Sequence, residues 1–286
     1  MPEATSVIHD IGYQRYEGPR HSRRHIAAAL YLHSLRTAFG LGRSAKAKVF
    51  PWLIVSIVTL VAVVLAAVRA QINPEAVTYA QFPQVQTLLI IFFCAVVGPE
   101  LVSRDLHSGV LPLYFARPLR VGDYVTAKLA ALITATFLLV AGPLTVMFAA
   151  TAFDVNDLSA LGRELIDYLL AQAYTAVYAV VFASVALLVS SFIRRRAVAA
   201  AATVAVFLLT TPVVGVLSVL PSQTATELAG LASPTTLVGG VGDWLFEPGG
   251  ENDVGPFGPL YAVVALALVA GCVLLLFARY RKVSSS

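Results

Sequence analysis

The amino-acid sequence predicts an all-α, polytopic membrane protein with six transmembrane helices and an N-terminal amphipathic helix in the membrane interface. Three observations support this fold class. Of the 286 residues, 58% are hydrophobic and only 13% are charged, and the mean hydropathy is +0.79. Six stretches are apolar over about the 20 residues that a helix needs to cross a bilayer. Lys and Arg are concentrated in every second connection, as expected when cytoplasmic loops carry the positive charge.

Residues 1–49 are predicted to form a cytoplasmic lead-in followed by the interfacial helix. The first 20 residues lack helical periodicity and contain Gly12, Gly18 and Pro19, so we expect an irregular segment there. Over residues 21–41 the apolar side chains fall on one broad helical face, with polar side chains opposite. This pattern predicts a helix that lies in the membrane interface, and the alternative is a soluble helix packed on a partner.

The transmembrane domain is predicted over residues 50–282, and residues 283–286 form a cytoplasmic tail. The six apolar stretches are 52–68, 82–97, 127–152, 165–193, 197–220 and 260–278. The second stretch is the weakest, since it is short and begins with polar residues. We therefore allow it to continue to about Val102.

The orientation of the spans follows from the distribution of Lys and Arg. Eighteen of these 20 residues lie before the first span, between the second and third, between the fourth and fifth, or after the sixth. The opposite connections keep only Arg69 and Arg163. Both termini are therefore expected in the cytoplasm. This topology also explains the net charge of +4, so nucleic-acid binding is not expected.

The inner connection between the second and third spans, at about 99–122, is predicted to contain a short helix. Pro99 suits the first position of a helix, and Glu100 lies near the positive end of the helix dipole. Gly109 is expected to end this helix, and Asp123 is expected to be the N-cap of the third span. A rigid helix between two spans is a shape that can transmit force. The alternative is an ordinary loop.

The outer connection between the fifth and sixth spans, at about 221–258, holds many apolar residues but no Lys or Arg. Ser233 and Pro234 are typical of an N-cap and a first helical residue, so we expect a helix over about 234–241 that ends at glycines. So much apolar surface favours two short re-entrant helices that dip back into the outer leaflet. These helices could cover a transport pathway.

No catalytic or metal-binding residue can be assigned from the sequence. The nucleotide-binding pattern GxxxxGK[ST] is absent, as are HExxH, CxxC and GxSxG. His21 and His25 share a helical face, but the arginines between them disfavour a bound cation. Only Glu100 and Asp167 approach the spans, both at span ends, so no buried acid marks a proton path. The energy source is therefore expected in another chain, and this chain is not expected to be an enzyme.

Two neighbouring motifs in the inner connection resemble the permease subunits of type-2 ABC exporters. They are ELVSRDLHSG at 100–109 and LYFARPLRVGDYVTAK at 113–128. In that family an acidic residue closes the second span, an acid and a glycine follow, and a run of the type xRPxRxxxYxxxK leads into the third span. The resemblance extends to the six spans, the interfacial helix and the apolar outer connection, over roughly residues 21–280. Residues 8–20 also resemble the start of many bacterial permeases of this kind.

The resemblance implies the membrane-spanning subunit of an ATP-driven exporter in the bacterial inner membrane. Its implied partners are a dimer of cytoplasmic ABC ATPase subunits, which bind ATP and Mg²⁺, and a second permease copy or paralogue. It assigns a coupling helix, which docks in the ATPase, to Glu100, Leu101, Val102, Ser103, Arg104, Asp105, Leu106 and His107. It also implies that the second and fifth spans line the substrate path, with polar candidates at Gln84, Gln86, Thr87, Thr203, Thr210 and Thr211. Alternatively, these six side chains stabilise helices by bonding to their own backbones.

The cargo is expected to be hydrophobic or amphiphilic, because few charges face the spans. The alternative function is a non-transporting membrane scaffold or sensor that recruits a cytoplasmic protein through the same inner connection. An intramembrane enzyme is disfavoured because no pair of nucleophile and base can be assigned.

Overall fold

The computed structural model of the protein describes residues 22–71, 78–109, 114, 119–152, 157–246 and 254–284. Within these residues the chain forms helices and no strand. Six helical segments of the described chain are long and apolar enough to cross a membrane. The predicted all-α, polytopic membrane fold is confirmed. The expected lead-in over 1–20 and the last two residues of the expected tail lie outside the described residues.

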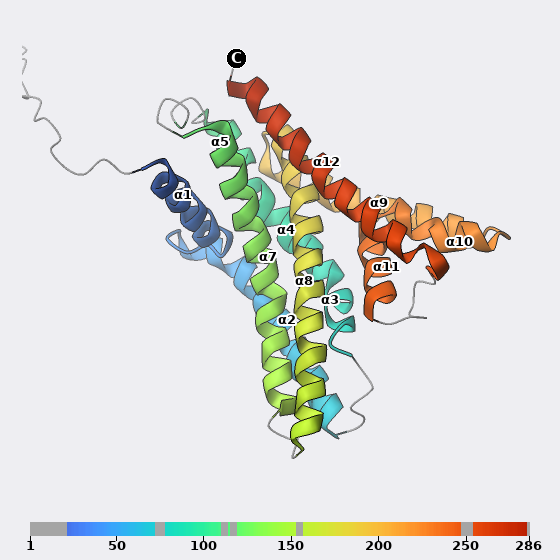
Figure 1. Cartoon of the computed structure of the whole chain (residues 1–286). Coiled ribbons are helices and arrows are strands. Elements are labelled where there is room, and N and C mark those ends of the chain that lie inside the picture. Colours follow the sequence, from blue (N-terminus) through green and yellow to red (C-terminus); the bar gives the residue numbers. More distant parts are fainter. Residues whose placement is uncertain are drawn as a thin grey trace, which may run out of the picture.

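The helices follow one another along the chain as Figure 1 shows. Two of them, η1 and η2, are 3-10 helices. In order they are α1 (Arg23–Ala38), α2 (Ala45–Gln71), α3 (Gln81–Val85), α4 (Thr87–Leu101), α5 (Ser103–Ser108), α7 (Val121–Ala152), α8 (Leu158–Phe192), α9 (Arg196–Ser218), α10 (Gln223–Ala229), η1 (Gly230–Ala232), α11 (Pro234–Phe246), η2 (Gly255–Phe257) and α12 (Gly258–Ser284).

The centre of the bundle is formed by α8, with α7 and α4 packed along it (Figure 1). The apolar windows of α4 and α8 are mostly buried, whereas those of α2, α9 and α12 are less than one third buried. Small residues permit the close approach of α4 to α8, since a Cβ added at Gly98 would lie 2.9 Å from Ser190 Oγ. The exposed apolar faces of α2, α9 and α12 are what a bilayer or a second membrane subunit would cover.

A helix is present at the predicted place as α1, which packs against α7 and α4. Leu30, Ser34 and Ala38 form its buried face. Arg23 holds it to α7 through two hydrogen bonds to the Asp123 carboxylate, of 2.5 and 2.7 Å. The helix itself is therefore found where the sequence placed it, and its position in the membrane interface stays a prediction.

Two details of the inner connection differ from the prediction. Pro99 does not open a helix, because α4 continues through it to Leu101, and α5 begins only at Ser103. The buried packing of α4 around Pro99 offsets the cost of proline inside a helix, about 3 kcal/mol. Nor is Asp123 the N-cap of the third span: α7 begins at Val121, and the Asp123 carboxylate accepts a hydrogen bond from the backbone N–H of Arg120. Gly109 does end α5, with a positive φ of 65°.

The outer connection contains the two expected short helices, α10 and α11. The predicted start of α11 at Pro234 is confirmed, but its predicted end at about residue 241 is wrong, since it continues to Phe246. Aromatic rings occupy the space beside its glycines. A Cβ added at Gly240 would lie 2.5 Å from the Tyr261 ring, and one at Gly242 would lie 2.2 Å from Tyr174. These glycines therefore allow the two tyrosine rings to pack closely against the middle of α11, and they do not end the helix.

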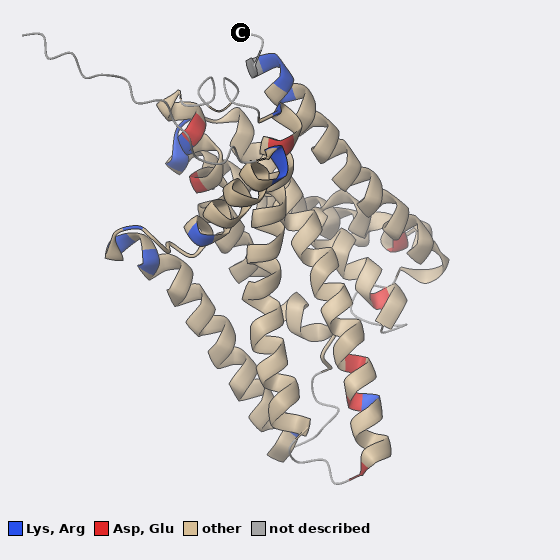
Figure 2. Ribbon diagram, turned by 60° about the vertical axis from the view of Figure 1, so that its left-hand side comes forward, with Lys and Arg blue, Asp and Glu red and all other residues tan. Residues whose placement is uncertain are grey.

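The charged residues are distributed unequally between the two ends of the bundle. Figure 2 shows most Lys and Arg residues at one end, where the C-terminus also lies. We call this the basic end; α5, the connection between α8 and α9, and the last turns of α12 meet there. At the opposite end α7 finishes and α8 begins. The charge bias that was read from the sequence is thus a property of the folded chain.

Candidate functional site

The buried side of α5 is bonded to the two central spans at the basic end. Ser103 is fully buried, and its hydroxyl donates a hydrogen bond of 2.9 Å to the backbone carbonyl of Ser190, near the end of α8. Asp105 forms an ion pair of 2.9 Å with Lys128, in the second turn of α7. Leu101 and Val102, just before α5, are also buried. Any displacement of α5 therefore has to move the ends of α7 and α8, or break these bonds.

The ion pair between Asp105 and Lys128 is largely shielded from solvent, with the two side chains only 14% and 6% exposed. The Tyr124 hydroxyl donates a second hydrogen bond of 2.9 Å to the same carboxylate. The Tyr124 ring in turn packs against Tyr280 of α12, at 5.2 Å between ring centroids. A buried carboxylate needs such partners, because desolvation of a charge without compensation is costly. The cluster fixes α5 to α7 and brings α12 to the same point.

Glu100, in the last turn of α4, joins three helices. Its carboxylate accepts a hydrogen bond of 2.7 Å from Arg43, which precedes α2, and forms a second ion pair with Arg196, the first residue of α9. Both oxygens of the carboxylate are thus engaged within the chain. In this arrangement Glu100 links the ends of α2, α4 and α9 that lie at the basic end, and its carboxylate is occupied by residues of this chain.

The outward side of α5 is formed by Arg104, His107 and Ser108, which are exposed. Asp105 and Leu106 are partly buried. The eight residues predicted for the coupling helix therefore divide into a buried set that holds the helix and an exposed set that a partner can reach. Helical periodicity alone did not separate them, because a six-residue helix is too short for a clear amphipathic pattern.

A second polar cluster joins α3, α8 and α11 away from the basic end. The Gln84 side-chain amide donates hydrogen bonds of 3.1 Å to the Asp243 carboxylate and 3.3 Å to the Tyr174 hydroxyl. The Tyr174 hydroxyl donates to the backbone carbonyl of Val238 in α11, at 3.0 Å. Asp243 is only 2% exposed. One predicted path residue therefore lies beside a buried carboxylate on α11.

Asp243 is a functional candidate that the sequence reasoning missed. From the sequence, the outer connection was described only by its apolar residues and its lack of Lys and Arg. A signal was available, because Asp243 is a lone carboxylate inside the glycine-rich apolar run VGGVGDWLF. A buried ionisable residue in a membrane protein is a functional candidate by default.

The other predicted path residues do not gather around one space. The hydroxyls of Thr87, Thr203, Thr210 and Thr211 all bond to backbone carbonyls three or four residues earlier, as the alternative interpretation expected. Thr87 and Thr210 also contact hydroxyls of other segments, Tyr178 of α8 and Ser233 just before α11 respectively. Gln86 is buried at the break between α3 and α4, where its side-chain nitrogen has no hydrogen-bond partner among the described residues.

A third cluster closes the end opposite the basic end. Arg69, at the end of α2, forms an ion pair of 3.0 Å with Glu164 of α8 and lies over the Tyr79 ring. The Tyr79 hydroxyl donates to Glu164 at 2.7 Å and contacts the Thr151 hydroxyl of α7. Burial raises the pKa of Tyr79 to about 12, so it remains a hydrogen-bond donor at neutral pH. Arg69, an exception to the charge bias, thus has an acidic partner.

Metal ligands do not cluster in the described part of the chain. No group of three or more His, Cys, Asp or Glu residues is placed to hold an ion there. His21, one of the two histidines considered in the sequence, is outside the described residues. The two cysteines, Cys94 and Cys272, are free and buried.

A family model described as ABC-2 family transporter protein matches residues 56–238, which is more than half of the chain. The match runs from α2 into α11 and includes Gln84 and the whole of α5. No curated protein matches the chain.

Proposed function

Because this chain belongs to the ABC-2 family of transporter proteins, we propose that it is the permease subunit of an ATP-driven exporter whose ATPase is a separate cytoplasmic subunit. The single observation that carries the proposal is the arrangement of α5. This helix is bonded to α7 and α8 on one side, and it exposes Arg104, His107 and Ser108 on the other. A partner that binds the exposed side and displaces α5 would therefore also displace α7 and α8.

In this mechanism, α5 docks in the ATPase and passes its movement to the spans. ATP binding draws two ATPase subunits together, and ATP and Mg²⁺ are held by those subunits. Ser103 and Asp105 transmit the displacement of α5 to α8 and α7. Glu100 extends it to α9 and to the start of α2 through Arg196 and Arg43. The inner ends of several spans then move together.

The substrate path in this proposal runs between the second and fifth spans, α4 and α9, and α11 is its outer gate. The bond from Gln84 to Asp243 and the bond from Tyr174 to Val238 hold α11 to α3 and α8. Opening the gate breaks these bonds, so the structure has the features of a closed outer side. The cargo is hydrophobic or amphiphilic.

The assembly contains two permeases, either two copies of this chain or a copy and a paralogue. The weakly buried faces of α2, α9 and α12 leave apolar surface for a second subunit and for lipid. In this proposal the basic end faces the cytoplasm of a bacterial cell, both termini are inside, and the complex lies in the inner membrane; the concentration of Lys and Arg at that end supports this orientation.

The test is purification of the tagged chain together with the ATPase encoded beside it, followed by reconstitution. We expect co-purification and substrate-dependent ATP hydrolysis. The double variant Arg104→Ala/His107→Ala should weaken ATPase recruitment about tenfold, since both side chains lie on the exposed side of α5. Arg163→Ala removes an exposed arginine of α8 from the opposite end, and is the matched control.

Two results would contradict the proposal. If the purified chain recruits no ATPase and moves substrate alone, the ATP-driven mechanism fails. If it recruits a cytoplasmic partner but deletion of the gene causes no change in substrate accumulation, the chain is a scaffold or sensor and not a transporter.

A further inference from the structure

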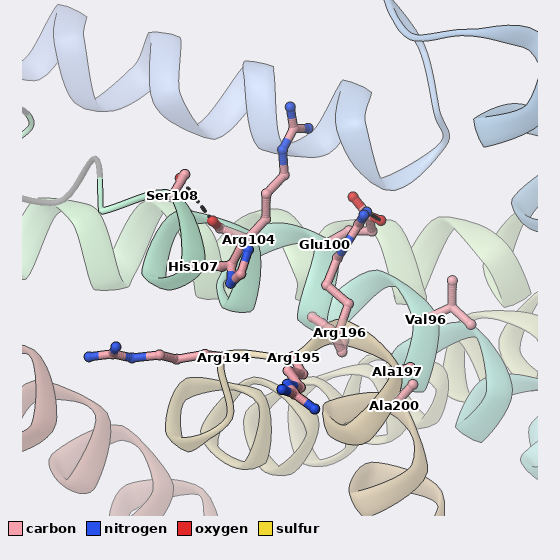
Figure 3. A pocket seen from close by; sticks show the side chains of 11 residues that line it. Val96, Glu100, Arg104, His107, Ser108, Arg194, Arg195, Arg196, Ala197 and Ala200 are labelled. Atoms are coloured by element: carbon pink, nitrogen blue, oxygen red, sulfur yellow. Dashed lines mark hydrogen bonds and ion pairs between the residues drawn. The ribbon is translucent and has the colours of Figure 1, made fainter.

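A hollow of about 780 Å³ opens at the basic end between α4 and α5 on one side and the start of α9 on the other (Figure 3). One wall is apolar and includes Val96, Ala197 and Ala200. Arg104 and His107 of α5 and the arginines of the connection between α8 and α9 form the rest of the rim. The hollow is therefore amphipathic, and it lies between the two spans that are proposed to line the path.

The rim of this hollow carries an excess of positive charge. Among the described residues that line the hollow, Glu100 is the only one with a carboxylate, and it is already paired with Arg43 and Arg196. The side chains of Arg104, Arg194 and Arg195 have no carboxylate partner among the residues that the structure describes. Figure 3 shows the Arg104 side chain pointing away from the start of α9, so the unpaired positive charge beside the hollow comes from Arg194 and Arg195, which have no acidic counterpart in the described chain.

The start of α9 adds to the positive electrostatic potential of the rim. The helix begins at Arg196, and its N-cap, Arg195, makes no side-chain capping bond to the first turn. The unsatisfied N–H groups of a helix start and the helix dipole both favour an anion. The arginines and the helix start act together at one rim, so an anionic group gains from both.

The apolar wall continues into the membrane along the exposed face of α9. Val204 and Leu208 follow Ala197 and Ala200 on one helical face, given their spacing of three, four and four residues, and Leu208 is exposed. A hydrocarbon chain can lie along this face while a headgroup sits at the rim. Inorganic phosphate can use the rim but gains nothing from the wall.

We infer that this hollow binds an amphiphile with an anionic headgroup, and that such molecules are the class of cargo the transporter takes from the inner leaflet. The first part rests on the hollow and its charges, and the second part rests on the proposed transport function. Arginine forms bidentate, charge-assisted hydrogen bonds with phosphate and carboxylate groups, which suits it to this role. Zwitterionic and cationic amphiphiles of equal chain length bind less well, because the rim offers no anion to them.

Binding can be tested on the purified full-length chain without its ATPase. Native mass spectrometry in a neutral maltoside detergent would compare dimyristoyl phosphatidic acid with dimyristoyl phosphatidylcholine, which share their acyl chains. We expect a preference of about tenfold for phosphatidic acid, and no displacement by millimolar inorganic phosphate. Equal binding of the two lipids, or full displacement by inorganic phosphate, overturns the inference.

Variants distinguish the contact with the lipid headgroup from the space that the acyl chains occupy. Arg194→Ala/Arg195→Ala should abolish the preference for phosphatidic acid, and Arg163→Ala, the control, should leave it unchanged. Ala200→Trp fills the hollow and should weaken binding of both lipids. If Arg194→Ala/Arg195→Ala keeps its lipid preference but loses the ATPase, the rim is a docking surface for an acidic protein and the inference is overturned.

The transport part needs the complex with its ATPase in proteoliposomes. We expect ATP to drive phosphatidic acid, and not phosphatidylcholine, across the bilayer, and movement of both lipids at equal rates overturns this part. A chain that prefers phosphatidic acid but recruits no ATPase contradicts the proposed function while the binding site stands. A complex that transports other substrates but shows no lipid preference contradicts the inference while the proposed function stands.

Discussion

Single residues at the basic end have roles that their charge alone does not reveal. Lys128 is an example, because it belongs to the positive charge of an inner connection and yet lies almost fully buried beside Asp105. Its ammonium group is a structural partner for a carboxylate and contributes little to the exposed charge. Arg194 and Arg195, in the same end of the molecule, remain exposed and supply the rim of the hollow.

Removal of one partner of the ion pair between Asp105 and Lys128 should lower the stability of the fold strongly, whereas removal of both partners should not. Lys128→Met leaves the Asp105 carboxylate shielded without its cation, so we expect the free energy of unfolding to fall by about 3–5 kcal/mol. The double variant Asp105→Leu/Lys128→Met should recover most of this loss. Denaturant titration in detergent measures both. A single variant as stable as the natural chain would show that water reaches the carboxylate.

Glu100 should be a linking residue and not a docking residue. Glu100→Gln breaks the ion pairs to Arg43 and Arg196 but leaves the exposed side of α5 unchanged. We therefore expect recruitment of the ATPase to be unchanged. ATP-driven transport should fall about tenfold, because the link from α4 to α2 and α9 is weakened; a tenfold loss corresponds to about 1.4 kcal/mol of coupling free energy. Pull-down and transport assays on the same variant give the two readouts. A loss of ATPase recruitment would show that Glu100 belongs to the docking surface.

Among the elements, α11 depends most on close packing. It contains glycines at positions where two tyrosine rings, from α8 and α12, lie against its backbone. The Tyr261 ring is fixed by a hydrogen bond of 2.7 Å from its hydroxyl to the backbone carbonyl of Glu227. The ring therefore has little freedom to move aside for a larger residue at Gly240.

Gly240→Ala should destabilise the protein by about 1–3 kcal/mol, because the new methyl group meets the Tyr261 ring. Gly271→Ala in α12 is the matched control, since a Cβ there meets no atom within 4 Å. The control should be neutral or more stable by about 0.5–1 kcal/mol, as is usual for glycine to alanine inside a helix. Thermal unfolding in detergent compares the two. Equal effects of the two substitutions would argue against tight packing of α11.

At the scale of the whole molecule, the two ends of the bundle are closed differently. At the basic end, bonds from α5 and Glu100 join the helices around an open, positively charged hollow. Away from it, α11 is held to α3 and α8 by Gln84, Tyr174 and Asp243. Under the proposed function, this asymmetry fits a transporter that is open at the basic end and shut on the side of α11.

A covalent link across the outer gate should stop transport. In a background with Cys94→Ala and Cys272→Ala, a short bifunctional methanethiosulfonate would join Gln84→Cys to Asp243→Cys, whose natural side chains are 3.1 Å apart. We expect transport to stop and to return when a reductant cleaves the link. The control joins Thr87→Cys to Tyr178→Cys, which ties α4 to α8 without α11. Unimpaired transport in the cross-linked gate variant would exclude α11 as the gate.

The sequence by itself determined the fold class, the six spans, the basic end, the short inner helix and the family. These properties depend on local composition: the number of consecutive apolar residues is matched to the thickness of the bilayer, and Lys and Arg mark one side of it. The family resemblance came from a short run with fixed spacing, which the match over residues 56–238 confirms. The expected helix boundaries were less accurate where packing overrides local preference, as at Pro99 and at the glycines of α11.

Only the tertiary structure decided which residues of the inner helix are exposed, where Glu100 and Lys128 find their partners, and that Asp243 is buried. The physical reason is that these partners come from helices far apart in the chain. Gln84 and Asp243 are separated by 159 residues, and Arg43 and Glu100 by 57. A hydropathy pattern defines which face of a helix is apolar, but it does not define which other helix covers that face or which side chain meets a given carboxylate. Those pairings follow from the packing of the bundle as a whole.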